Sequence, residues 1–81
     1  MPSEAAQFDA LVTRIRDSRL PSPAVRRQIR EAAKVPMRES ARELKVAPMT
    51  FLRWERGEVQ PRRDHAIAYR QFLDALREAV S

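Results

Sequence analysis

Residues 37–57, MRESARELKVAPMTFLRWERG, decide the fold of this 81-residue chain. Their apolar side chains recur at spacings of three and four, which predicts two short helices over residues 37–45 and 48–56, joined by a tight connection. Pro48 suits the first position of a helix, where the missing N–H costs nothing. Gly57 is the only glycine in the chain, and its place after a helical stretch is typical of a left-handed residue that ends a helix.

The helical pattern continues on both sides of this stretch. Ser22 and Pro23 predict the start of a helix that ends near Lys34, because Pro36 disfavours helical backbone before it. We expect an N-terminal helix over residues 4–18, capped by Ser3, and a C-terminal helix over residues 64–80. The first carries an apolar stripe of Phe8, Leu11, Val12 and Ile15; the last carries Ala66, Tyr69, Phe72, Leu73, Leu76 and Val80. The fold class predicted is all-α: one domain, residues 1–81, forming a five-helix bundle.

The composition excludes several classes of protein. The chain has no cysteine and one histidine, His65, so it has no disulfide framework and no cluster of cysteine or histidine metal ligands. A single glycine excludes a glycine-rich phosphate loop. We therefore expect neither an enzyme nor a bound metal or cofactor. No apolar run is long enough to span a bilayer, and the first residues lack the basic and then apolar order of a signal peptide, so we expect a cytoplasmic protein without a membrane partner.

Charge favours a polyanionic partner. The chain has sixteen Lys and Arg against eleven Asp and Glu. In the predicted helix 48–56, at about 100° per residue, Phe51 and Trp54 point to one side, whereas Met49, Arg53 and Arg56 point to the other. An exposed helical face that carries arginines fits the major groove of DNA.

Several short motifs lie in one segment of the chain, residues 29–61: Ile29-Arg30, Ser40-Ala41-Arg42-Glu43-Leu44, Val46-Ala47-Pro48-Met49-Thr50, Arg53-Trp54-Glu55-Arg56-Gly57 and Pro61. In these motifs the segment resembles the XRE/Cro family of phage and bacterial repressors. The resemblance implies a lambda-repressor-like fold whose core covers about residues 24–61, with a central helix-turn-helix. Residues 48–56 would be the recognition helix.

The resemblance also implies which residues contact DNA. The base-reading positions of the family correspond to Pro48, Met49, Leu52 and Arg53. Its backbone-contacting positions correspond to Met37, Arg38, Thr50, Arg56, Arg62 and Arg63. It implies a structural ion pair between Arg30 and Glu55. Lys45 occupies a turn position where the family usually has Gly or a small polar residue, so either Lys45 is left-handed or the turn differs.

Other side chains receive simpler interpretations. Trp54 is expected in the core, and Tyr69 in the core or a dimer contact with its hydroxyl at the surface. Arg26 and Arg27 are expected on a solvated face, and His65 is expected to be exposed.

We expect a DNA-binding transcriptional repressor of phage or mobile-element type that acts as a homodimer on a palindromic operator, because two recognition helices double the readout. Two alternatives stay open. One is an antitoxin-like protein-interaction module that binds DNA secondarily and uses residues 4–18 to cover a protein partner. Exposed apolar surface on that helix would favour it. The other is an architectural or excision-type protein that bends DNA.

Overall fold

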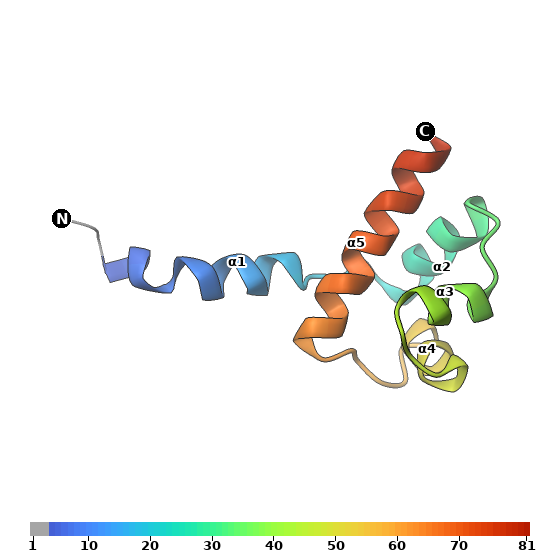
Figure 1. The fold of residues 1–81 in the computed structure, drawn as a ribbon, viewed down its shortest axis with the longest axis horizontal. Helices are drawn as coiled ribbons and strands as arrows, with labels where there is room; N and C mark the ends of the chain where they lie inside the picture. Colours follow the sequence, from blue (N-terminus) through green and yellow to red (C-terminus); the bar gives the residue numbers. More distant parts are fainter. Residues whose placement is uncertain (1–3) are drawn as a thin grey trace.

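A computed structural model describes residues 4–81 and shows an all-helical chain (Figure 1). It has a 3-10 turn η1 (Glu4–Phe8) followed by five α-helices: α1 (Asp9–Asp17), α2 (Pro23–Ala32), α3 (Met37–Glu43), α4 (Pro48–Glu55) and α5 (Arg63–Val80). Residues 4–81 contain no strand. The predicted all-α class with five helices is confirmed. Ser3, the expected cap of the first helix, lies outside the described residues.

The helix boundaries follow local chemistry. The Ser22 side chain accepts a hydrogen bond from the Val25 N–H at 3.3 Å, and Pro23 is the first residue of α2, as expected. The N-terminal helix differs from its prediction, since its first turn is 3-10 and α1 proper begins at Asp9. Helices α3 and α4 are one or two residues shorter than expected, ending at Glu43 and Glu55.

A left-handed residue follows each of the three middle helices. Lys34, Lys45 and Gly57 have φ values of 58°, 57° and 74°. After α3, the N–H of Val46 donates to the Ala41 carbonyl at 3.0 Å, which closes the helix end around Lys45. Lys45 therefore adopts the left-handed alternative. At Gly57 a Cβ atom would lie 3.2 Å from Pro23 Cγ, so glycine suits both the backbone angle and the space.

The core lies where α2, α3 and α4 meet α5. Its buried apolar residues are Ile29, Ala41, Leu44, Phe51, Trp54, Tyr69 and Leu73. The Tyr69 ring centroid lies 5.5 Å from that of Phe51 and 5.8 Å from that of Trp54. Trp54 is thus a core residue, as expected. These aromatic contacts fix one side of α4 and leave its opposite side on the surface.

Helix α1 is peripheral. Apart from η1, the only element it packs against is α5, within residues 4–81. It contains no buried residue, and in Figure 1 it extends away from the other helices. The radius of gyration is 14.5 Å, whereas a compact domain of this length has about 12 Å. The chain therefore consists of a four-helix core, α2 to α5, and a projecting helix.

Candidate nucleic-acid interface

Helix α4 presents two chemically different faces. Phe51, Trp54 and Glu55 are buried against the core, and the periodicity predicted this for Phe51 and Trp54. On the other side Met49 is 58% exposed, and Arg53 is exposed as well. Because α3 packs against α4 across the short turn of residues 44–47, the outer face of α4 is held in a fixed orientation.

The residues predicted to contact DNA lie mainly at the surface. Met37 and Leu52 are half-buried, and the others are exposed: Pro48, Met49, Thr50, Arg53, Arg38, Arg56, Arg62 and Arg63. Met37 and Arg56 line one open depression of about 220 Å³ between α2, α3 and α4. Thr50 and Arg62 line another of about 260 Å³ beside the start of α5. The fold thus brings predicted backbone-contacting residues together in pairs, while their contacts with DNA stay predictions.

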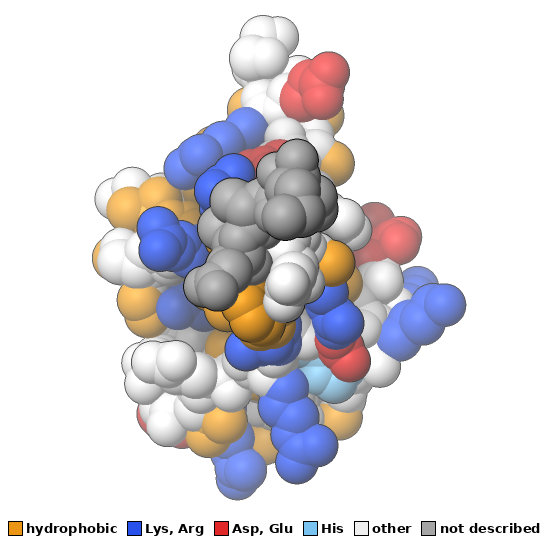
Figure 2. Space-filling model, turned by 90° about the vertical axis from the view of Figure 1, so that its left-hand side faces the viewer, with side chains coloured by type: hydrophobic (Ala, Val, Ile, Leu, Met, Phe, Trp, Pro, Cys, Tyr) orange, Lys and Arg blue, Asp and Glu red, His pale blue; other side chains and the backbone are white. Residues whose placement is uncertain are grey.

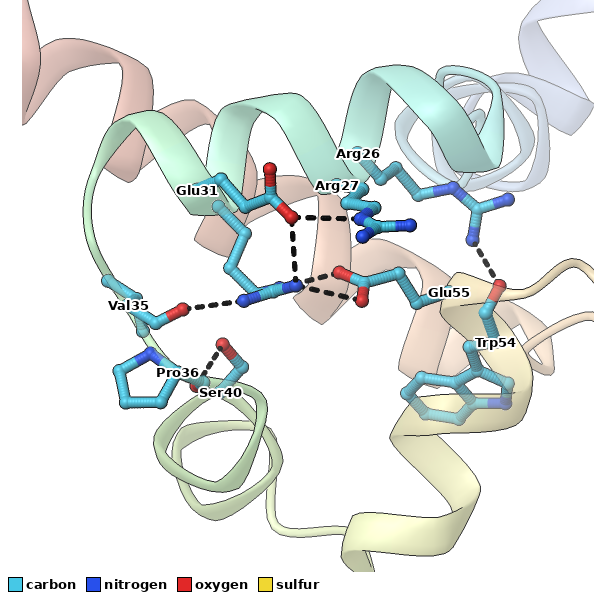
Figure 3. A network of polar contacts seen from close by, with 9 residues as sticks. Arg26, Arg27, Glu31, Val35, Pro36, Ser40, Trp54 and Glu55 are labelled. Carbon is cyan, nitrogen blue, oxygen red and sulfur yellow. Dashed lines mark hydrogen bonds and ion pairs between the residues drawn. The ribbon is translucent and has the colours of Figure 1, made fainter.

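The predicted ion pair between Arg30 and Glu55 is present and links α2 to the end of α4 (Figure 3). Arg30 donates from Nε to Oε1 at 2.6 Å and from Nη2 to Oε2 at 2.9 Å. Its third hydrogen bond goes to the Val35 carbonyl at 2.9 Å. The two side chains are 10% and 6% exposed, so this two-point contact is a buried support for α4.

Arg26 is also buried and also links α2 to α4. The prediction that it lies on a solvated face is wrong. Its Nε donates to the Pro21 carbonyl at 2.9 Å and its Nη1 to the Trp54 carbonyl at 3.3 Å. The guanidinium carbon also lies 5.5 Å from the centre of the Tyr69 ring. Arg26 precedes Arg30 by four residues, so both share one face of α2. This spacing of four residues is the feature of the sequence that could have predicted the burial of Arg26 beside Arg30.

Arg27 does lie on the exposed face of α2, as expected. It forms an ion pair with Glu31 at 2.8 Å, four residues along the helix. The hydrogen bond from Arg27 lowers the pKa of Glu31. Both partners are exposed, so the pair contributes little to stability.

The position of the Tyr69 hydroxyl also differs from the prediction. It is buried rather than at the surface, and it has no hydrogen-bond partner among the described residues. The Tyr69 ring fills the centre of the core beneath α4, and this position carries the hydroxyl inside with it. Burial raises the pKa of Tyr69 above its ordinary value.

We expect Tyr69→Phe to keep or increase stability at neutral pH, because it removes a polar group that is buried without a partner. The folded protein holds the phenolic proton more tightly than the unfolded chain does. The contribution of the protonated hydroxyl to the free energy of unfolding should therefore be fully present below the unfolded pKa of about 10. It should be lost as the pH rises above that value. Urea unfolding between pH 7 and 11 should show a steeper alkaline loss for the wild type than for Tyr69→Phe. Equal slopes would contradict this assignment.

Residues 4–81 show neither a cluster of metal ligands nor a helix that could span a membrane. No three or more His, Asp or Glu side chains in this part of the chain are placed to hold a metal ion. None of its helices combines the length and apolar character needed to cross a membrane. His65 is exposed at the start of α5, with its ring centroid 5.4 Å from that of Trp54.

No protein-family model, no curated protein and no solved structure matches the chain.

Proposed function

We propose that this protein is a sequence-specific, double-stranded DNA-binding regulator of transcription that reads the major groove with α4. The observation that carries the proposal is the two-faced character of α4. Phe51 and Trp54 anchor one face, and Arg53 and Met49 stand exposed on the other. A helix of this kind fits the width of the major groove.

The side chains on the outer face suit base recognition. Arg53 offers a guanidinium that can bind O6 and N7 of guanine together, which is the commonest specific contact. Met49, Pro48 and Leu52 offer apolar surface for a thymine methyl group. From these side chains we expect the bound DNA sequence to contain guanine with thymine nearby.

The charge distribution supports contacts between exposed arginines around α4 and the phosphates of DNA. Residues 36–63 contain seven basic and four acidic residues. One of those acids, Glu55, is buried against Arg30 and does not face the outside. Exposed arginines flank α4 at Arg38, Arg56, Arg62 and Arg63. Such contacts set affinity and register without reading sequence.

On the resemblance of the short motifs in residues 29–61 to those of phage and bacterial repressors, we propose a repressor, of phage or mobile-element type, that acts in the cytoplasm by occupying promoter DNA. One α4 helix offers few base contacts, so we propose that two copies bind half-sites about 34 Å apart.

Selection from a random pool of duplex DNA at physiological salt tests the proposal. We expect enrichment of a motif that contains guanine at a fixed position, repeated with inverted symmetry. Binding that enriches no motif would show that the outer face of α4 does not read bases, and the regulator proposal would have to be abandoned.

A protein-interaction module is the second candidate, because the apolar stripe on α1 is exposed. Phe8, Leu11, Val12 and Ile15 are 39–55% exposed. Monomeric proteins seldom leave such side chains together on one helix without a partner. If a partner protein covers this stripe and the selection yields no DNA motif, the interaction module becomes the better interpretation.

A further inference from the structure

Phe8, the last residue of η1, and Leu11, Val12 and Ile15 of α1 form one apolar stripe, called here the stripe of α1, which no element within residues 4–81 buries. The four side chains lie on one helical face at spacings of three and four residues. All four are exposed, while α1 rests only on α5 and η1 within residues 4–81. Figure 2, viewed from the side of the N-terminus, shows hydrophobic side chains among Lys and Arg side chains at this end of the molecule. Within residues 4–81, therefore, no element buries the stripe.

Charged residues border the stripe in an uneven pattern. Asp9 and Arg16 are seven residues apart, so they lie on the same flank about two turns from each other. Arg14 lies on the opposite flank, where it forms an ion pair with Asp64 of α5 at 2.8 Å. Neither Asp9 nor Arg16 takes part in a side-chain ion pair within the described residues, and both are exposed.

We infer that the occupant is the α1 helix of a second copy of this chain, packed antiparallel. When two copies of a helix pair antiparallel about a two-fold axis, each flank meets the same flank of its partner. Asp9 of each copy then lies opposite Arg16 of the other, giving two ion pairs beside the apolar contact. A parallel pair would instead bring opposite flanks together and set Arg16 beside Arg14 of the second copy. Charge complementarity therefore favours the antiparallel arrangement.

The second copy leaves the proposed DNA-binding face free. Helix α1 packs on α5 and has no packing contact with α4 among the described elements. The stripe of α1 would join two copies whether or not they bind DNA, because self-association needs no nucleic acid. Four apolar side chains per copy make a small interface, so we expect a dissociation constant on the order of 10 μM.

Sedimentation equilibrium without DNA, over a wide range of protein concentration, tests this inference. The wild type should be a monomer at low concentration and a dimer at high concentration. Leu11→Glu should abolish the dimer, because it places like charges within the apolar contact. Thr13→Glu, on the exposed side of α1 away from the stripe, should leave the dimer unchanged. Circular dichroism of each variant shows that the helices are retained.

Charge reversal tests the antiparallel orientation. Asp9→Arg and Arg16→Asp should each weaken the dimer roughly tenfold, because each turns two attractive contacts into repulsive ones. An equimolar mixture of the two variants should form a heterodimer of wild-type strength, and the variant that carries both changes should dimerise again.

A parallel pair predicts a different result, since Arg16→Asp alone would then gain contacts with Arg14 of the second copy and dimerise more strongly. That result would overturn the proposed orientation. A wild type that stays monomeric at about 1 mM, far above the expected dissociation constant, would overturn the inference itself. Sequence selection by the monomer would still leave the proposed DNA binding intact.

Discussion

Arg30→Ala is expected to lower the free energy of unfolding by about 3–5 kcal/mol. The substitution removes a guanidinium that makes two hydrogen bonds to Glu55 and one to the Val35 carbonyl. It leaves the Glu55 carboxylate buried at the end of α4 without its partner, which is the costly outcome for a buried ion pair. A loss of this size is a large share of the stability of a small domain.

Urea denaturation followed by circular dichroism measures this effect, and α2 supplies a matched control. Arg27 lies on the same helix, three residues before Arg30, and Arg27→Ala breaks its exposed ion pair with Glu31. Solvent screens this pair, so we expect a much smaller loss of stability than for Arg30→Ala. Arg30→Lys should be intermediate, because an ammonium group keeps the charge but cannot make the two-point contact. Similar losses for Arg30→Ala and Arg27→Ala would show that the buried pair gives no special support to α4.

A double variant separates the value of the pair from the cost of leaving one partner unpaired. Arg30→Met combined with Glu55→Met removes both charges and keeps apolar volume at the junction of α2 and α4. We expect it to be more stable than either single variant, because no charge is left buried alone. A double variant as unstable as the sum of the two single variants would contradict this account.

Local sequence signals predicted most of the helices. Ser22 with Pro23 marks the start of α2, and Gly57 follows α4 in the left-handed conformation. These signals work because caps and positive φ angles depend on a few neighbouring residues. The inward side of α4 was also predictable, since Phe51 and Trp54 follow the helical period.

The remaining features depend on contacts between distant segments. Arg26 is buried because it meets the carbonyls of Pro21 and Trp54, and nothing adjacent to it in the chain reveals the second of these. The Tyr69 hydroxyl is buried because the ring lies between Phe51 and Trp54. The stripe of α1 has the pattern of a core-facing helix, yet it is exposed, because periodicity shows that a face is apolar and not what covers it.

Arg53→Ala is expected to remove the preference for guanine at one position of the selected DNA site. The loss of discrimination at that position should be about 1–3 kcal/mol, or roughly five- to 150-fold in relative affinity. Arg53 is exposed on α4, and its side chain has no ion-pair or hydrogen-bond partner among the described residues. Its replacement should therefore leave the fold unchanged, and thermal unfolding checks this directly.

Arg62→Ala is the matched control for Arg53→Ala, since it removes the same side chain from an exposed position just before α5. A phosphate contact carries no sequence information, so binding to every DNA sequence should weaken alike, and the slope of log affinity against log salt should fall by about one. Titrations of the selected site and of its guanine-substituted form at several salt concentrations distinguish the two variants. If both variants weakened both DNAs equally, Arg53 would be a phosphate contact, and base reading would have to come from Pro48, Met49 and Leu52. Apolar side chains alone recognise thymine methyl groups and cannot select guanine, so the motif enriched by that protein would contain thymine without a fixed guanine.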